Sequence, residues 1–508
     1  MELHPVEILP DLWSFGDSCN VYVLKRGDEA IAVDFGSGRW LVHLQALGIK
    51  RLTHVFLTHH HADQCSGLQN HALGVFKIHA PGGEEQYLDP ACQHNGSFDI
   101  RYKGCPDSYA VLRGGIESIT YDMAGFSDFF WGDQRIRFVH TPGHGRHACS
   151  IVIDHAGKQV VFCGDAAYAG ATIWQPYHLE WDHWTGTGVL AAWEGIQRLY
   201  GIAVDMLCPS HGPVIAQQPR MMLKQLARKL MLVYHTKGQI SIGEPDAYIM
   251  PQTLSSGAHR LSEHLYHFGA NGYLIIGGNG GGLVIDPFSE DMPALELLLS
   301  YLGNTRPTMA TSTHYHADHC DGIPYLSSRY QCRAVLHPWI AEKLVESGAG
   351  FVPWLPQSPI IADELWPIRG EWTWNEYKFT VAPWPGQTQW HCVFMTAVDG
   401  KRIVFGGDSF QPSSRWNGTG GYCAYNGSRF EEGFSASAAL MMAWAPDIVL
   451  CGHNTYYAFR NSKFRKIIQW ARRAEKAVIA ICPSSNLDID YYRIKHSEGA
   501  LFWVQQAY

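Results

Sequence analysis

Two short strings of this sequence are nearly identical and lie about half the chain apart. Residues 58–64 read THHHADQ, and residues 313–319 read THYHADH. Histidine and aspartate packed this densely are costly to bury unless a charged group lies among them. The sequence therefore predicts two polar sites, and the different last residue raises the question of whether the two sites are equivalent.

The similarity between the two halves extends beyond this motif. Three further pairs of segments match in the same order, and each combines an apolar strand pattern with a nearby Asp or His. These pairs are 20–38 with 272–290, 160–166 with 403–409, and 203–212 with 445–454. Matched His and Asp positions are 255 residues apart at the first motif and 242 to 243 residues apart later, so one loop is shorter in the second copy. The chain is therefore interpreted as a tandem repeat.

Each repeat is expected to end in an amphipathic helix. Met, Leu and Val recur at helical spacing over residues 216–239, and residues 461–480 form the corresponding segment of the second copy. Pro, Gly and Ser gather after the first of these helices, which is typical of a linker. Residues 481–508 alternate apolar and polar positions and are expected to form one or two closing strands or a short appendage. We therefore predict two domains, residues 1–245 and 246–508.

Composition limits the classes of function. The net charge of −8 and the lack of a Lys/Arg cluster argue against nucleic acid as a partner, because phosphates call for a basic surface. No window reaches 18 uninterrupted apolar residues and the N-terminal sequence lacks a signal-peptide pattern, so no membrane span or export is expected. The 13 Cys contain no CxxC pair, which is typical of scattered reduced thiols. We expect a cytoplasmic protein that acts on a small molecule.

Histidine and aspartate side chains follow several apolar strand patterns of the first repeat. His59 and His61 come directly after one such strand, and alternate residues of an extended segment point the same way. His144, Asp165 and His211 each stand at or just after the end of another strand-like segment. Imidazole nitrogen and carboxylate oxygen are the usual ligands of zinc in open catalytic sites. The sequence therefore predicts a metal site at one rim of the fold, built by strand-end loops.

Taken together, these motifs resemble the metallo-β-lactamase-fold superfamily. The resemblance rests on HxHxD after a strand, TPGH, a strand-ending GD and a late SHG, and both halves show the same order of segments. It implies an α/β fold of two tandem αββα sandwiches, each with two mixed sheets face to face and helices outside. It also implies up to two Zn²⁺ ions in each domain, with iron as another possible metal.

The resemblance implies a ligand set for each repeat. In the first repeat the first metal takes His59, His61 and His144, and the second metal takes Asp63 and His211, with Asp165 as the bridge. In the second repeat the first metal takes His314 and His316, and the second metal takes Asp318, His319 and His453, with Asp408 as the bridge.

Each repeat departs from the family pattern at one position. The family motif is HxHxDH, but the first repeat has Gln64 at its end, and the second has Gln387 in place of the TPGH histidine. An amide oxygen is a weak zinc ligand compared with imidazole, so each altered subsite is expected to bind more loosely. His391 stands four residues after Gln387 and is a candidate replacement.

The first repeat is expected to hold the main catalytic site, because its three-histidine subsite is complete. In a two-metal site the ions lower the pKa of a bound water and stabilise the developing oxyanion. The catalytic candidates are Asp63 and, in the second repeat, Asp318, which would orient the nucleophile and pass a proton to the leaving group. The second repeat is expected to hold metal as well, and its activity is left open.

The leading hypothesis is a hydrolase that uses a metal-bound hydroxide to cleave a small ester, thioester or lactone. The string THHHAD resembles the thioester-hydrolysing glyoxalase II branch, although that branch ends the motif in DH. A β-lactamase is less favoured, because the chain has long inserts, a duplication and no export signal.

Two other classes of function stay open. Related non-haem dioxygenases hold one iron on two His and one Asp, and His59, His144 and Asp165 would supply that set. Some tRNA-maturation nucleases are tandems of this fold with one degenerate copy, but the acidic net charge counts against RNA.

Several residues near the motifs are assigned structural roles. His60 and Tyr315 stand between the ligands and should point away from them, and Cys65 and Cys320 match across the repeats as small buried residues. Structural or surface roles are expected for the remaining histidines near the motifs, which are His71, His79, His140, His147 and His155.

Aromatic residues after the first bridging aspartate are candidates for the wall of the substrate pocket. They are Trp174, Trp181 and His183, and a plain core role is equally compatible with the sequence. Inserts at 82–130 and 345–375, rich in Gly, Pro and aromatic residues, are expected to shape the pocket.

Overall fold

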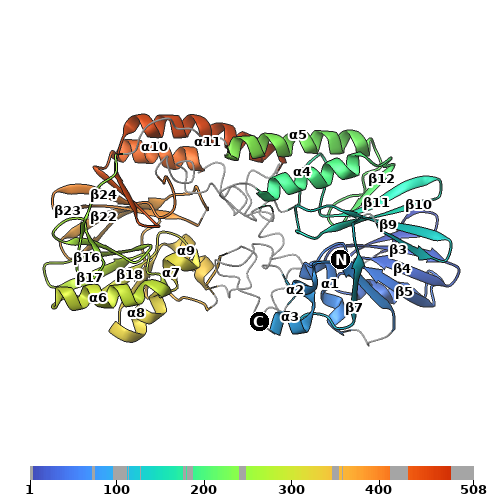
Figure 1. Ribbon diagram of the computed structural model, residues 1–508, viewed down its shortest axis with the longest axis horizontal. Helices are drawn as coiled ribbons and strands as arrows, with labels where there is room; N and C mark the ends of the chain where they lie inside the picture. The colour runs from blue at the N-terminus through green and yellow to red at the C-terminus, as the bar shows by residue number, and fades with distance from the viewer. Residues whose placement is uncertain are drawn as a thin grey trace.

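The computed structural model shows two similar halves (Figure 1). It describes residues 4–70, 75–94, 111–112, 114–125, 127–174, 179, 187–238, 247–345, 354–356, 358–388, 390–411 and 433–481. Each half contains two sheets, with helices outside them.

The described part of the first half contains a seven-stranded and a five-stranded sheet. The larger sheet runs in chain order through β1 (Val6–Leu9), β2 (Leu12–Gly16), β3 (Asn20–Arg26), β4 (Glu29–Val33), β5 (Arg51–Phe56), β6 (Lys77–Pro81) and β7 (Ile119–Met123). The smaller one has the order β12 (Met206–Pro209), β11 (Lys158–Gly164), β10 (Cys149–His155), β9 (Gln134–His140) and β8 (Asp128–Trp131). Strands β4 to β7 pair in parallel, and so do β11 and β12, so their carboxyl ends meet at one edge of each sheet.

The second half repeats this plan in its described residues. Its larger sheet contains β13 (Gln252–Thr253), β14 (His259–Arg260), β15 (Leu265–Phe268), β16 (Gly272–Ile276), β17 (Gly281–Ile285), β18 (Arg306–Thr311), β19 (Arg333–Leu336) and β20 (Glu364–Leu365). Its smaller sheet contains β21 (Gly370–Trp374), β22 (Tyr377–Pro383), β23 (Cys392–Val398), β24 (Lys401–Phe405), β25 (Ile448–Cys451) and β26 (Thr455–Ala458). The parallel pairs β17–β18 and β24–β25 correspond to β4–β5 and β11–β12. The predicted α/β class with two tandem αββα sandwiches is confirmed.

Helices flank the sheets in both halves. In the first half they are α1 (Ala62–Cys65), α2 (Glu85–Leu88), α3 (Pro90–His94), α4 (Thr187–Tyr200) and α5 (Pro219–Gly238), with 3-10 turns at Arg39–His43 and Ser66–Asn70. In the second half they are α6 (Met292–Leu302), α7 (Ala317–Cys320), α8 (Ile323–Tyr330), α9 (Pro338–Leu344), α10 (Phe434–Trp444) and α11 (Asn461–Ile481), with a 3-10 turn at Ser289–Asp291. Both predicted amphipathic helices are present, as α5 and α11.

The space between the two sheets of the first half is filled by apolar side chains. Tyr22, Val33 and Phe56 from the larger sheet belong to one buried cluster with Ile151 and Phe162 from the smaller sheet. Burying a side chain of this size contributes about 1.5–3 kcal/mol. This packing fixes the two sheets against each other, and so fixes the strand ends from which the polar residues project.

A second apolar cluster joins the two halves. It includes Leu226 on α5, Trp470 on α11, and residues of both smaller sheets. The indole N–H of Trp470 donates to the carbonyl of Thr236 at the end of α5, over a distance of 2.8 Å. In Figure 1, α5 and α11 meet over the middle of the molecule. The predicted domain boundary at residue 245 and the segment 482–508 lie outside the described residues, and the boundary stays a prediction. None of the described helices is both long and apolar enough to span a bilayer.

Two buried histidines away from the sequence motifs make the stability depend on pH. Burial lowers the pKa of His267 and of His337 to about 4. His337 caps α9, because its Nδ1 accepts from the Trp339 N–H and its Nε2 donates to the Ile368 carbonyl. In the unfolded chain both rings would titrate near the usual pKa of about 6.5.

We expect these two histidines to lower the free energy of unfolding as the pH drops from about 6.5 to about 4. In this window the histidines are protonated in the unfolded state but stay neutral in the folded state. Each histidine with a pKa lowered to about 4 therefore reduces the free energy of unfolding by at most about 3 kcal/mol. His337→Asn keeps a capping side chain without the titrating ring, so it should flatten the pH dependence in denaturant titrations. An unchanged slope would contradict this assignment.

Candidate metal centres

Four strand ends of the first half bring the predicted ligands together. His59 and His61 follow β5, and His61 in extended conformation precedes α1, whose first turn carries Asp63. The remaining predicted ligands follow β9, β11 and β12 and are His144, Asp165 and His211. The chain therefore turns into the short helix α1 between the two leading histidines and Asp63, and the ligands fall into two groups.

The first group consists of three buried imidazoles. His59, His61 and His144 each offer a ring nitrogen, and these atoms all lie within 4.8 Å of one another. Nδ1 of His61 and Nε2 of His144 are 3.0 Å apart. Zinc bonds imidazole nitrogen at about 2.0–2.1 Å, so small movements of these rings would place all three nitrogens around one ion. The donor set fits a metal.

The second group places His211 between two carboxylates. Its Nδ1 lies 2.8 Å from Asp165 Oδ1, and its Nε2 lies 3.1 Å from Asp63 Oδ2. Burial lowers the pKa of His211, but the Asp165 and Asp63 carboxylates outweigh burial and raise that pKa to about 10. The indole of Trp174 stacks on the His211 ring with centroids 4.4 Å apart, in accord with its predicted place on the pocket wall. Trp181 and His183 lie outside the described residues.

Asp165 connects the two groups. Its Oδ2 lies 3.7 Å from His59 Nε2 and 3.5 Å from His144 Nε2. The amide of Gln64 donates to the same oxygen at 3.4 Å. Gln64 therefore lies where the family histidine is expected, and it contacts the bridging carboxylate.

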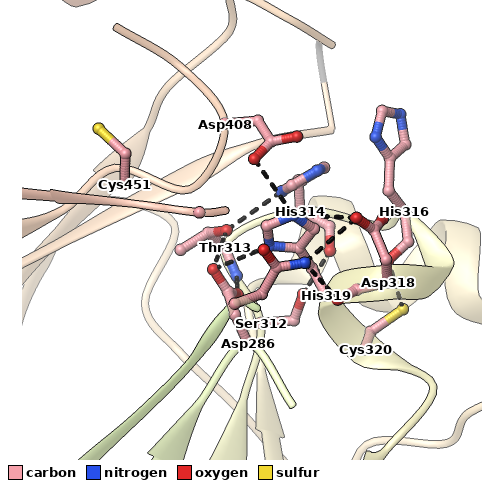
Figure 2. Close-up of polar contacts among 12 residues, drawn as sticks. Asp286, Ser312, Thr313, His314, His316, Asp318, His319, Cys320, Asp408 and Cys451 are labelled. Atoms are coloured by element: carbon pink, nitrogen blue, oxygen red, sulfur yellow. Dashed lines mark hydrogen bonds and ion pairs between the residues drawn. The ribbon is translucent and has the colours of Figure 1, made fainter. Parts of the chain in front are cut away.

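The second half assembles a different set of ligands. His314, His319 and Asp408 form one buried group (Figure 2). Asp318, His319 and His453 form another, so His319 belongs to both. Nε2 of His319 lies 3.2 Å from Asp408 Oδ1, and Nε2 of His453 lies 3.1 Å from Asp408 Oδ2. Nε2 of His314 is buried and makes no hydrogen bond with any described residue, as expected for an imidazole nitrogen that can bind a metal ion.

The predicted first-metal subsite of the second half is incomplete. The rings of His314 and His316 lie 4.5 Å apart, but His316 belongs to neither group of three ligands among the described residues. The amide of Gln387 donates to Asp408 Oδ2 at 3.0 Å, as Gln64 does to Asp165. His391 stacks on the His314 ring at 4.8 Å, and it is not part of any ligand group found in the described part of the chain.

A buried carboxylate behind each site was not assigned a role from the sequence. Asp34 accepts from the backbone N–H and the hydroxyl of Thr58, and Thr58 Oγ1 lies 2.9 Å from His59 Nδ1. Because the hydroxyl proton goes to the carboxylate, the ring N–H of His59 donates to the hydroxyl, which leaves Nε2 to bind a metal. Asp286 and Thr313 hold His314 in the same way. The signal available in the sequence was the recurrence of both Asp and Thr at matched positions.

Asn271 is another residue that the sequence did not single out. Its side chain is buried, and its amide donates to both the carbonyl and the carboxylate of Asp318, at 2.8 and 3.1 Å. Its oxygen accepts from the N–H of His453 at 2.6 Å, and His453 has a φ of 56°. Since this backbone conformation is uncommon outside glycine, Asn271 holds two candidate ligands in place.

The residues assigned structural roles are placed as expected where they are described. His60 pairs with buried Glu84 and stacks on Tyr87, and Tyr315 is buried against Trp390. Cys65 and Cys320 are fully buried. His79 bonds with Asp122, His140 with Arg146, and His155 with Pro10, whereas His71 lies outside the described residues.

Replacing Asn271 should weaken metal binding in the second half. We expect Asn271→Ala to lower the affinity of that half by about 10- to 100-fold, because such supporting hydrogen bonds hold the ligands in place. Chelator competition with purified protein measures this change. Asn279→Ala, in an exposed turn of the same half, is the control and should leave the affinity unchanged.

The sequence model of the metallo-beta-lactamase superfamily matches residues 15–211 and 265–453. The chain is 28% identical over 161 residues to a metallo-beta-lactamase fold-containing protein of Sulfurisphaera tokodaii, which covers 30% of this chain and 59% of that protein. It is 25% identical over 228 residues to an atrochrysone carboxyl ACP thioesterase of Emericella nidulans, which covers 42% of this chain and 58% of the thioesterase.

Further similar proteins include an enzyme and two solved structures. A hydroxyacylglutathione hydrolase of Tolumonas auensis is 27% identical over 165 residues, covering 31% of this chain and 53% of the hydrolase. The chain thus spans less than two thirds of the length of these relatives. A metallo-beta-lactamase structure from Cronobacter sakazakii is 17% identical with a TM-score of 0.36, covering 46% of this chain and 97% of that chain. A class B3 di-zinc metallo-beta-lactamase from an Alaskan soil metagenome is 15% identical with a TM-score of 0.33. The match covers 45% of this chain and 98% of that chain.

Proposed function

The chain belongs to the metallo-β-lactamase superfamily, and we propose that it is a metal-dependent hydrolase that cleaves a small ester, thioester or lactone. The observation that carries this proposal is the group of three buried imidazoles, His59, His61 and His144, beside Asp165. These three imidazoles would hold a metal ion, zinc in this proposal, and such an ion would supply activation of water and polarisation of the substrate carbonyl. The protein side chains supply the geometry and the proton transfers.

Asp63 is the proposed general acid and base. It is partly exposed at the edge of the site, and its Oδ2 contacts His211 Nε2 at 3.1 Å. A carboxylate in this place can accept a proton from the attacking water and return it to the leaving oxygen or sulfur. Trp174, which stacks on His211, gives the same side of the site an apolar surface.

We place the main site in the first half. Its three imidazoles are assembled, whereas in the second half His316 belongs to no group of three ligands among the described residues, and the Gln387 amide donates to Asp408. Hydrogen bonds through Thr58 to Asp34 already orient His59. The second half is proposed to hold metal as well, in its group of Asp318, His319 and His453.

The substrate class is supported by the relatives. Two of them are named for hydrolysis of acyl thioesters or of an acylglutathione, so an acyl carbonyl is the proposed electrophile here. The net charge of −8 favours a small molecule over nucleic acid as the partner.

Removing the Asp63 carboxylate should abolish most of the activity. We expect Asp63→Asn to lower kcat by about 10²- to 10⁴-fold on the best substrate of an ester, thioester, lactone and phosphodiester panel. The metal content should stay unchanged. Asp318→Asn, at the matched position of the second half, should leave kcat within about twofold, and so should Asp133→Asn on the exposed surface. Loss of activity in Asp318→Asn with retention in Asp63→Asn would place the reaction in the second half.

A mono-iron dioxygenase is the second candidate, favoured by one observation. His59 and His144 both lie within 3.7 Å of Asp165, which is the two-histidine, one-carboxylate set that binds iron in such enzymes.

Metal analysis of the purified protein separates the two candidates. The hydrolase proposal expects zinc in the first half and no oxygen consumption with any substrate of the panel. Iron in the first half together with substrate-dependent oxygen uptake would replace the hydrolase proposal with the dioxygenase.

A further inference from the structure

The residue pairs 64/210 and 319/452 occupy matched positions in the two halves and differ together. The first half has Gln64 and Ser210, and the second half has His319 and Gly452. Ser210 and Gly452 each directly precede the last candidate histidine of their half. Position 452 therefore lies next to a candidate ligand, although no pattern in the sequence connects it with position 319.

In the second half, Gly452 leaves room for the His319 ring. A Cβ atom at Gly452 would lie 2.6 Å from His319 Cε1 and 2.4 Å from Asp408 Oδ1. Both distances are far below van der Waals contact. Nδ1 of His319 lies 3.1 Å from Asp286 Oδ2, and its Nε2 lies 3.2 Å from Asp408 Oδ1, so the ring stands between two buried carboxylates.

In the first half, Ser210 takes the place that the imidazole would need. Its hydroxyl donates to Asp34 Oδ2 at 2.6 Å, which is the carboxylate oxygen matched to the one beside His319. The Gln64 amide does not contact Asp34 through any described hydrogen bond and donates instead to Asp165. The buried carboxylate of Asp34 thus has hydrogen-bond donors without any contribution from the side chain at position 64.

We propose that Gln64 and Ser210 act as a coupled pair that closes the second-metal subsite of the first half. The first half then binds a single divalent ion on His59, His61 and His144, because Asp63, Asp165 and His211, although they also offer ligand atoms within 4.8 Å of one another, lack an imidazole at position 64. Two substitutions are needed to open the closed subsite. Histidine at position 64 supplies the ligand, and glycine at position 210 supplies the space and frees Asp34 to orient the new ring. This inference does not depend on the substrate or on the reaction.

Zinc stoichiometry of the full chain tests the coupling. His319→Ala provides the background, because His319 belongs to both ligand groups of the second half, so the remaining ions report the first half. In this background we expect one zinc ion per chain for the parent, for Gln64→His and for Ser210→Gly, measured by elemental analysis after dialysis. The double variant Gln64→His/Ser210→Gly should bind two.

A matched double variant separates the effect of the Cβ at position 210 from that of the Ser210 hydrogen bond to Asp34. Gln64→His/Ser210→Ala lacks the hydroxyl but keeps a Cβ at position 210, so it should still bind one ion. The proposal is overturned if the parent already binds two ions, if Gln64→His alone binds two, or if the folded glycine double variant binds one. Circular dichroism establishes that each variant is folded.

The reciprocal substitution in the second half tests the proposal even where the variants of the first half do not fold. In the otherwise unaltered chain, Gly452→Ser should lose the zinc ion of the second half, because its Cβ would displace His319 and Asp408. Gly278→Ser is the control, since a Cβ there meets its nearest neighbour at 3.5 Å. Retention of the second-half ion in folded Gly452→Ser overturns the proposal even if the glycine double variant of the first half does not fold.

Discussion

Each site is arranged around one buried carboxylate. Asp165 in the first half and Asp408 in the second are almost fully removed from solvent, and a buried charge of this kind needs cations or hydrogen-bond donors around it. Burial raises the pKa of Asp165, because His211 alone does not offset it. At Asp408, burial is outweighed by His453 and His319, which hold its pKa well below the usual range. Glutamine at position 64 and histidine at position 319 thus contribute differently to the pKa of the bridging carboxylate.

The duplication also contributes to the architecture that supports the first site. The loop after Asp165 packs into the apolar cluster shared by both halves, and the Ile173 N–H donates to the carbonyl of Ile481 at the end of α11. Lys229 on α5 donates to the carbonyls of Gly170 and Ala171 in the same loop. This loop leads to Trp174, which stacks on His211. A helix of the second half therefore helps to position an aromatic wall of the first site.

Much of the fold and of the ligand sets could be predicted because the repeat supplies an internal comparison. Polar residues that recur at strand ends stand out against apolar strands, and the order of the segments fixes which strand ends meet. The residues that orient the ligands were missed for a physical reason. Asn271 acts through hydrogen bonds to Asp318 and His453, and Ser210 acts through one hydrogen bond and its Cβ; neither residue leaves a periodic pattern. Their roles depend on contacts between loops that are far apart in the chain.

The same electrostatic constraint explains why glutamine replaced histidine in both halves. Loss of an imidazole beside a buried carboxylate removes one of the donors around that carboxylate, and a buried acceptor left unpaired costs about 1–3 kcal/mol, or more for a charged group. Gln64 and Gln387 each keep an N–H donor on the bridging aspartate, at 3.4 and 3.0 Å. An apolar residue in either place would have removed the donor along with the ligand. Glutamine therefore preserves the hydrogen bonding of the folded site while it weakens one metal subsite, and the two halves have done so at opposite subsites.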